Sequence, residues 1–302
     1  MAVAVIGTGL AGLACAGVLR EGGRDVVLFD KSRGFGGRMA TRRREGVAFD
    51  HGLPAFDPVA VETVPALAAL IEWGAWGRVA APRMNAFPRG IGEGCESRMG
   101  ARVVAVDART LDLTDESGAR HEGFSQIAVA IPAPQAGDLL SAHGDVFAPV
   151  GTATYAPCWT LMLGGLEGET TIPAYAEQTS GPLALVLRDD AKPGHPAAAP
   201  CYVAHARADW AIRNLERTAE EVADELSIAF AAITGLDPTR APYRAAHRWR
   251  YSQPIRVVPA PFLLSEDGRI GACGDWCGED RSGGDARAAW RSGAALGRAM
   301  LA

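Results

Sequence analysis

The sequence has no excess of charge of one sign and no long apolar run. Its 30 basic and 35 acidic residues leave a net charge of −5, so we expect no general attraction to nucleic acid or to an anionic membrane. No uninterrupted apolar stretch is long enough to span a bilayer, and no basic segment precedes residues 14–16, which otherwise resemble a signal-peptide cleavage site. We therefore expect a cytoplasmic protein without nucleic-acid or membrane partners.

The six cysteines have no regular spacing, and the six histidines are dispersed. Cys273 and Cys277 do not form a C-x-x-C pair, and no combination of cysteine and histidine completes an evident zinc site. We expect reduced structural thiols and no metal. With 302 residues, of which 48% are hydrophobic, the chain is long enough for one large or two interleaved domains.

A glycine-rich segment near the start is typical of phosphate binding. Residues 3–6 form a short apolar run, as expected of a buried parallel strand, and Gly7, Gly9 and Gly12 then match G-x-G-x-x-G. The first glycine permits a tight turn, the second lets a pyrophosphate approach the backbone, and the third lets the following helix pack on the strand. The alternative is a glycine-rich turn in an ordinary α/β protein.

The residues after this motif complete a dinucleotide-binding unit. The helix that begins at Leu10 and Ala11 supplies unpaired N–H groups and a partial positive charge for the phosphates. A second apolar strand at residues 26–29 delivers Asp30, at the distance where a carboxylate accepts hydrogen bonds from a ribose.

The segment after Asp30 identifies a family resemblance. Gly36, Gly37 and Arg38, with Thr41, resemble the GG-R-x-x-T/S segment of the FAD-dependent amine oxidase and renalase superfamily. The resemblance implies that Arg38 clamps the diphosphate of FAD, next to Lys31. The alternative for residues 42–44, which are all arginine, is a solvated basic loop.

Residues 50–56 resemble the D-H-G-A-Q-Y-F segment that runs beside the flavin ring in renalases. Asp50, His51 and Gly52 are kept, whereas residues 53–55 are Leu-Pro-Ala. The resemblance places Pro54 and Ala55 near the flavin. His51 is either a hydrogen-bonded structural histidine or a catalytic base.

The middle of the chain alternates between the two expected domains. Residues 59–76 are apolar at helical spacing, and residues 86–92 resemble the family's entry into a helix. A strand at 102–106 would bring the backbone of Val103 to the adenine, a β-meander follows, and residues 132–136 read PAPQA, as in renalases.

The pattern of residues 151–256 predicts an antiparallel sheet backed by helices. Strand-like runs lie at residues 157–163, 183–188, 201–206 and 248–252, and Thr218 with Glu221 forms a capping box for a helix over residues 222–234. Renalase-like segments here contribute aromatic and imidazole side chains that either sandwich a planar ligand or belong to the core: Trp159, His247, Trp249 and Tyr251.

The C-terminal region resembles the segment that contacts the flavin in proteins of this family. A strand ends at Gly274 and Asp275, whose carboxylate would bind a ribityl hydroxyl, and Gly284 with Ala286 starts a final helix whose dipole would stabilise reduced flavin. The resemblance thus assigns the following residues to FAD binding: Gly7, Gly9, Leu10, Ala11, Gly12, Asp30, Lys31, Gly37, Arg38, Pro54, Ala55, Val103, Gly274, Asp275, Gly284 and Ala286.

These observations predict an α/β protein of the p-hydroxybenzoate-hydroxylase-like fold. A discontinuous Rossmann-type FAD-binding domain comprises residues 1–57, 86–150 and 260–302, and an α+β substrate domain with an antiparallel sheet comprises 58–85 and 151–259. The resemblance to bacterial renalases implies an oxidase that takes a hydride from a small substrate, an isomeric dihydro-NAD(P), and reduces O2 to H2O2. The alternatives are a flavin amine oxidase or desaturase acting on another small substrate, and a flavin-binding protein without turnover.

Overall fold

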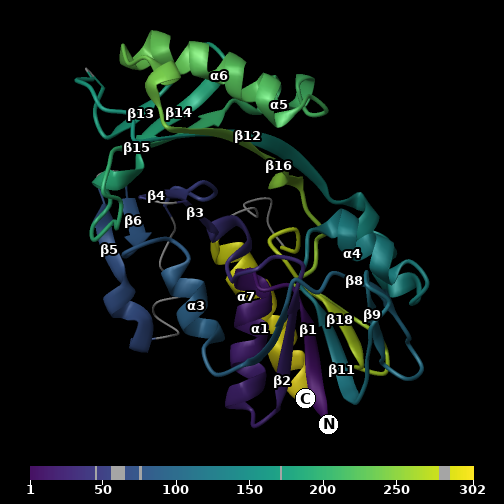
Figure 1. The fold of residues 1–302 in the computed structure, drawn as a ribbon. Helices are drawn as coiled ribbons and strands as arrows, with labels where there is room; N and C mark the ends of the chain where they lie inside the picture. Colours follow the sequence, from purple (N-terminus) through teal and green to yellow (C-terminus); the bar gives the residue numbers. More distant parts are fainter. Residues whose placement is uncertain (45, 56–64, 75–76, 171, 279–285) are drawn as a thin grey trace. The chain divides into compact units, whose positions relative to one another are not determined.

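The computed structural model describes residues 1–44, 46–55, 65–74, 77–170, 172–278 and 286–302 (Figure 1). The chain divides into two compact units. The first comprises Met1–Gly37, Pro88–Thr154 and Pro254–Ala302, and the second comprises Arg38–Phe87 and Tyr155–Gln253. The described residues from Arg38 to Ala55, which the sequence analysis assigned to the FAD-binding domain, therefore belong to the second unit. The reason is that β3 (Thr41–Arg44) and β4 (Val47–Asp50) pair with each other and Phe49 packs against the antiparallel sheet of that unit.

The first unit is built on a parallel sheet. Its strand order is β17-β18-β11-β1-β2-β7, and only the edge strand β17 runs antiparallel to its neighbour. This confirms the predicted Rossmann-type architecture, in which buried apolar strands lie side by side. The strands are β1 (Ala2–Ile6), β2 (Val26–Asp30), β7 (Glu96–Met99), β11 (Phe124–Val129), β17 (Leu263–Leu264) and β18 (Ile270–Ala272).

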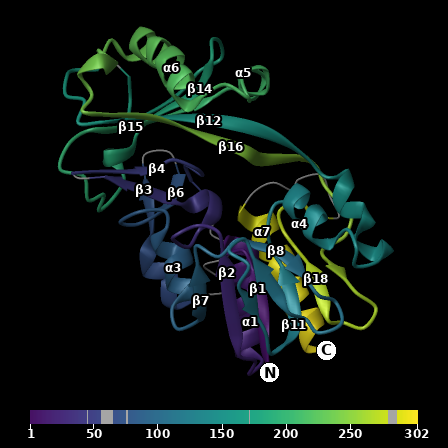
Figure 2. The same cartoon turned by 45° about the vertical axis from the view of Figure 1, so that its right-hand side comes forward.

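Helices α1 (Leu10–Glu21) and α7 (Ala286–Leu301) lie side by side in this unit, as both ribbon views show (Figures 1 and 2). Glycines make the close approach possible: a Cβ on Gly293 would lie 1.9 Å from the carbonyl oxygen of Ala11. One turn further along α7, a Cβ on Gly297 would lie 2.9 Å from the carbonyl oxygen of Cys15. The two helices are therefore in backbone contact, although their sequences are almost 300 residues apart.

The rest of the first unit contains the predicted meander. The strands β8 (Val103–Val106), β9 (Leu113–Asp115) and β10 (Arg120–His121) form a three-stranded antiparallel sheet. The next strand, β11, does not pair with this sheet but joins the parallel sheet beside β1. The unit also contains α4 (Ala133–Leu140) and the 3-10 helix η3 (Asp145–Thr152), while α3 (Ala86–Gly92) spans the boundary between the units.

The second unit is built on a five-stranded sheet of order β13-β14-β15-β12-β16, whose β13, β14, β15 and β12 pair antiparallel. The predicted strands are all found, with longer bounds at β12 and β16. The strands are β12 (Thr154–Gly164), β13 (Tyr175–Glu177), β14 (Leu183–Arg188), β15 (Cys201–Ala206) and β16 (Tyr243–Arg256).

The two faces of this sheet bury different partners (Figure 1). One face packs against α5 (Ala208–Arg213) and α6 (Ala219–Thr234), whose Val222, Leu226 and Phe230 join Trp159 in a hydrophobic core. The capping box predicted for α6 is formed, because Thr218 and Glu221 bond reciprocally. The other face packs against Phe49 of β4 (Val47–Asp50), which pairs with β3 (Thr41–Arg44).

The helix predicted over residues 59–76 is wrong in the part that the structure describes. A 3-10 helix, η2 (Pro65–Leu70), is followed by the paired strands β5 (Ile71–Gly74) and β6 (Gly77–Ala80). The reason is local, because Gly74 and Gly77 disfavour a helix, and Gly77 takes a φ of +139°. Short 3-10 turns also lie at η1 (Gly37–Met39), η4 (Asp189–Ala191) and η5 (Pro238–Arg240).

None of the helices in the described part of the chain combines the length and apolar character needed to cross a membrane. All six cysteines carry free thiols. Burial raises the pKa of the Cys15 thiol and of the Cys277 thiol to about 12, so these groups are protonated and unreactive at neutral pH.

Candidate functional site

The glycine-rich loop of the first unit has the geometry that its motif predicts. Gly7 takes a φ of +107°, and a Cβ there would lie 2.3 Å from the carbonyl oxygen of Ala130. A Cβ on Gly12 would lie 1.9 Å from the carbonyl oxygen of Gly7 itself, so the turn closes directly onto α1. Both positions therefore require glycine for steric reasons alone.

The N-terminus of α1 is open for an anion. Gly9 is the N-cap residue, no side chain caps this end of the helix, and no acidic residue occupies the first turn. A Cβ on Gly9 would meet no atom within 4 Å, in contrast to Gly7 and Gly12. The amides of Leu10 and Ala11 begin the helix there, where the helix dipole favours negative charge.

Asp30 holds this loop together. Its Oδ2 accepts hydrogen bonds from the Thr8 amide and hydroxyl, both at 2.7 Å, and its Oδ1 accepts two more from Ser32, at 2.8 and 2.7 Å. The carboxylate lies at the end of β2, as predicted, and its two oxygens already have four donors within the chain. A ribose hydroxyl would therefore have to share or replace one of these donors.

The second glycine pair lies against the first motif. The Gly36 amide donates to the carbonyl oxygen of Thr8 at 2.9 Å, and a Cβ on Gly37 would lie 3.4 Å from the Cα of Gly9. Segments almost 30 residues apart thus form one small-residue surface at the helix end. Lys31 is exposed at its edge.

The remaining candidates of the first unit have different settings. Val103 is buried in β8, and Asp275 is 3% exposed just beyond β18. A Cβ on Gly274 would lie 2.2 Å from Nε1 of Trp276, and the Gly274 amide donates to the Ser292 hydroxyl of α7 at 3.0 Å. Ala286 begins α7, whereas Gly284 lies outside the described residues.

In the second unit, Arg38 and the segment after β4 are joined through the backbone. The guanidinium of Arg38 donates to the carbonyl oxygen of Ser252 at 2.8 Å, and the Arg38 carbonyl oxygen accepts the Leu53 amide at 2.8 Å. A Cβ on Gly52 would lie 1.9 Å from that carbonyl oxygen. The position of Pro54 and Ala55 therefore depends on the backbone of Arg38.

Three of the predicted substrate-facing side chains form one cluster. The ring centroids of His51 and His247 lie 4.8 Å apart, and that of Trp249 lies 5.1 Å from His51 and 4.4 Å from His247. The indole of Trp249 donates to the His51 carbonyl oxygen at 2.9 Å. The guanidinium of Arg42 lies 3.1 Å from Nδ1 of His247. We call these four residues the histidine cluster.

Both imidazoles of the histidine cluster are neutral at physiological pH. Burial, together with the charges of His247 and Arg42, lowers the pKa of His51 to about 3. Burial and the charge on Arg42 lower the pKa of His247 to about 4. His51 is therefore a neutral, hydrogen-bonded histidine rather than a base poised near neutral pH.

These low pKa values predict acid-sensitive stability. An unfolded histidine titrates near pH 6.5, so between about pH 6.5 and pH 4 the unfolded chain binds protons that the folded cluster does not. The free energy of unfolding should fall as the pH decreases through this window. Urea titrations at pH 7 and pH 5 measure the decrease, which should be smaller in His247→Asn than in the parent protein. An equal decrease would contradict this assignment.

The other two substrate-facing candidates differ from each other. Tyr251 is partly exposed on β16, and its ring contacts that of Tyr155 edge-on at 5.5 Å. Trp159 is a correction: it is 1% exposed in the core beside α6, and its indole donates to the carbonyl oxygen of Asn214 at 3.1 Å. The alternation of β12 turns Trp159 toward the helices, away from the face that carries Phe49.

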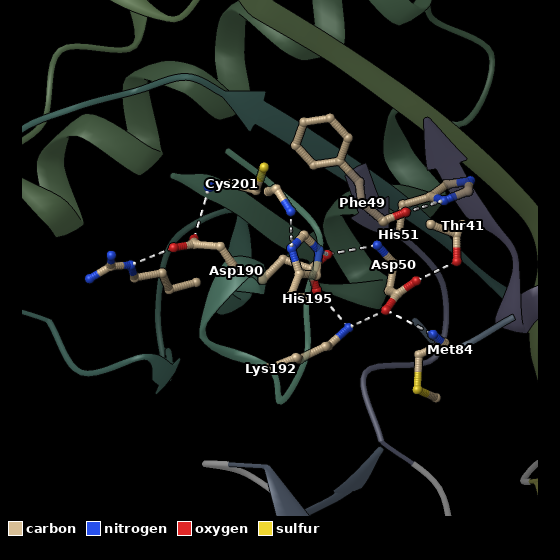
Figure 3. Close-up of polar contacts among 12 residues, drawn as sticks. Thr41, Phe49, Asp50, His51, Met84, Asp190, Lys192, His195 and Cys201 are labelled. Atoms are coloured by element: carbon tan, nitrogen blue, oxygen red, sulfur yellow. Dashed lines mark hydrogen bonds and ion pairs between the residues drawn. The ribbon is translucent and has the colours of Figure 1, made fainter. Parts of the chain in front are cut away.

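A buried ion network surrounds Asp50, the residue next to His51 (Figure 3). Lys192, whose side chain is 1% exposed, lies 2.9 Å from Oδ2 of Asp50 and 2.6 Å from Oδ1 of Asp189. Asp50 also accepts the Thr41 hydroxyl at 2.6 Å and the Met84 amide at 3.0 Å.

The network joins two distant segments through the main chain as well. The Asp50 amide donates to Oδ2 of Asp189 at 2.8 Å. The first residue of η4 therefore fixes the backbone of the residue that immediately precedes His51. Burial raises the pKa of Asp189, but the charge on Lys192 and a hydrogen bond from His195 outweigh it and hold that pKa below its ordinary value. The position of His51 is thus set by buried charges of opposite sign, in which the ammonium group of Lys192 balances the carboxylates of Asp50 and Asp189.

The sequence analysis missed the residues that build this support. Lys192 and Asp189 lie in a segment without any recognised motif, and Arg42 was considered as part of a solvated basic loop. One signal was available, because Lys192 is one of only two lysines in a chain rich in arginine. Among the described residues, no group of three or more histidine, cysteine, aspartate or glutamate side chains is arranged to hold a metal ion.

Comparison with known proteins gives local sequence similarity and a fold match over the whole chain. Residues 5–69 match the family model of the NAD(P)-binding Rossmann-like domain. A segment of 52 residues is 42% identical to 4,4'-diapophytoene desaturase (4,4'-diaponeurosporene-forming) of Staphylococcus aureus strain Newman. That match covers 17% of this chain and 10% of the desaturase, so the chain matches only a small part of this curated relative.

Solved structures with the same fold cover nearly the whole chain. A protein assigned as a protoporphyrinogen oxidase from Exiguobacterium sp. 255-15 superposes with a TM-score of 0.74 at 10% identity, over 99% of this chain and 98% of that one. Cyclohexylamine oxidase from Brevibacterium oxydans IH-35A gives 0.70 at 12%, over 99% and 98%. Putrescine oxidase bound to putrescine gives 0.68 at 13%, over 98% of both chains. These identities establish the fold alone.

Proposed function

We propose that this protein is an FAD-dependent oxidase that takes a hydride from a small reduced substrate. The substrate is an isomer of NAD(P)H reduced at the 2- or 6-position of the nicotinamide ring. One hydride leaves the substrate, which becomes NAD(P)+, and the two electrons with two protons convert O2 to H2O2. The observation that carries the proposal is the open, uncapped helix end at Gly9, enclosed by the two glycine stretches and Asp30.

The residues of the first unit fit a dinucleotide. Gly9 and Gly37 leave room for a diphosphate at the end of α1, and Leu10 and Ala11 offer their amides to it. Asp30 is placed to exchange one of its donors for a ribose hydroxyl. Bound FAD supplies the hydride acceptor and the route to O2, which the side chains of the protein lack.

The second unit favours a neutral, aromatic substrate over an amine. Arg42 places a positive charge against His51 and His247, and a like charge there opposes the binding of an ammonium group. Both imidazoles are neutral, and the indole of Trp249 adds an aromatic surface. Hydride loss from a dihydropyridine restores an aromatic ring, so this reaction needs no strong acid or base from the protein.

Two alternatives rest on other observations. An amine oxidase or desaturase acting on a different small substrate is favoured by the fold shared with putrescine and cyclohexylamine oxidases and by the segment shared with the desaturase. A flavin-binding protein without turnover is favoured by Leu53, Pro54 and Ala55, which replace the amide and phenol of the similar renalase segment.

Anaerobic stopped-flow absorbance separates these functions. We expect fast loss of the flavin absorbance on mixing with 2- and 6-dihydro isomers of NAD(P), and formation of NAD(P)+. Bleaching by putrescine or another amine, with none by the dihydronicotinamides, would establish the first alternative. No bleaching by either class would favour the second. The Gly12→Ala variant is the control for cofactor binding, because its methyl group collides with the Gly7 backbone and should yield protein without flavin.

A further inference from the structure

The hydrogen bonds of the histidine cluster determine which ring nitrogen of each histidine carries the proton. A guanidinium can only donate, so Nδ1 of His247 accepts from Arg42, and the proton of this neutral ring is on Nε2. A carbonyl oxygen can only accept, so Nδ1 of His51 carries a proton toward the Phe49 carbonyl oxygen at 3.4 Å. Nε2 of His51 is then a lone-pair acceptor.

The two outer nitrogens are consequently one donor and one acceptor. Within the part of the chain that the structure describes, neither Nε2 has a hydrogen-bond partner, whereas both Nδ1 atoms do. The rings are held edge to face, with centroids 4.8 Å apart. For both Nε2 atoms to serve one planar group, two hydrogen bonds of about 2.9 Å must reach adjacent atoms of that group from these neighbouring rings.

We propose that His51 and His247 recognise a primary carboxamide on the substrate. Nε2–H of His247 donates to the amide oxygen, and Nε2 of His51 accepts one amide N–H. A carboxylate offers two acceptors and leaves the His51 lone pair opposite negative charge. A ketone offers one acceptor and no donor, and an ammonium group offers only donors next to Arg42. Of these four groups, the carboxamide alone offers both the acceptor and the donor that the two nitrogens need.

This inference rests on the proposed function, since nicotinamide carries such a group, and it extends that function to a selectivity. Trp249 supports the assignment because it contacts both imidazoles and bonds the His51 backbone, which limits rotation of the pair. The low pKa values of His51 and His247 keep both rings neutral, so the donor and acceptor pattern persists throughout the physiological range.

Binding of three small pyridines to the flavin-containing protein tests the inference without turnover. The probes are nicotinamide, 3-acetylpyridine, which lacks the amide N–H, and nicotinate, which is a carboxylate, each titrated by calorimetry at pH 7.5. We expect nicotinamide to bind about three- to tenfold more tightly than 3-acetylpyridine, the equivalent of one hydrogen bond, and more tightly than nicotinate. Equal affinities, preference for nicotinate, or no binding of nicotinamide would overturn the proposal.

Two variants test which histidine donates to the amide oxygen and which accepts the amide N–H. His51→Phe should bring nicotinamide and 3-acetylpyridine to equal affinity, because the acceptor is gone. His247→Phe should weaken both ligands and keep their ratio, because the lost donor serves the oxygen that they share. His143→Phe, in the first unit, is the matched control and should change neither constant. A ratio that persists in His51→Phe would contradict the assigned role.

The two experiments distinguish failure of the carboxamide site from failure of the proposed oxidase function. Should nicotinamide bind with the expected selectivity while dihydronicotinamides leave the flavin oxidised, the carboxamide site stands and the oxidase function fails. Should dihydronicotinamides bleach the flavin while the three pyridines bind equally, the oxidase stands and the carboxamide site fails.

Discussion

The Lys192→Met protein is expected to lose about 3–5 kcal/mol of unfolding free energy. Methionine keeps the length of the buried side chain but leaves Asp50 and Asp189 without the cation that lies 2.9 and 2.6 Å from them. Two carboxylates then share a site that is almost inaccessible to water. Urea unfolding at pH 7 measures the loss.

A surface ion pair provides the matched control. Arg98→Met removes the guanidinium 2.6 Å from Glu96, but both side chains are more than half exposed, so a loss below about 1 kcal/mol is expected. Equal losses in the two variants would show that Lys192 has no special role.

The pH dependence of the stability loss in Lys192→Met tests whether the missing positive charge causes that loss. In the parent protein the pKa of Asp189 lies below its ordinary value, so its stabilising effect is present above the unfolded pKa and is lost as the pH falls through the folded pKa. Without Lys192, burial dominates and protonation of Asp189 relieves the penalty. The stability difference between Lys192→Met and the parent should therefore narrow from pH 7 to pH 4. A constant difference would indicate lost packing instead.

The Gly293→Ala protein should lose about 1–3 kcal/mol, the usual cost of overpacking, and with it much of its affinity for flavin. The added methyl would lie 1.9 Å from the carbonyl oxygen of Ala11, so α1 and α7 must move apart. Ala11 lies in the first turn of α1, where the diphosphate is proposed to bind. Thermal unfolding and the flavin content of the purified protein measure the two effects.

Gly17→Ala is the control in α1, the helix that Gly293 contacts. A Cβ on Gly17 would meet no atom within 4 Å, and alanine favours a helix over glycine by about 0.5–1 kcal/mol. This variant should be slightly more stable than the parent and keep its flavin. If Gly293→Ala behaves like Gly17→Ala, the close contact between the two helices is wrong.

The sequence by itself determined the dinucleotide-binding unit and the local helix signals. The strand, the glycine turn, α1 and Asp30 lie within 30 residues, and the contact that requires Gly12, with the backbone of Gly7, lies inside that segment. The capping box at Thr218 and Glu221 is equally local. Such features depend on hydrogen bonds and steric limits between neighbours, which a residue pattern expresses directly.

Only the tertiary structure decided what surrounds His51. His247 and Trp249 are almost 200 residues away in sequence, and Lys192 reaches Asp50 across 142 positions. The direction of Trp159 depended on which face of β12 the helices cover, and the strand at Ile71–Gly74 depended on pairing with Gly77–Ala80. These outcomes follow from long-range packing and from the burial of charge, since a side chain's partners there are chosen by the folded chain as a whole.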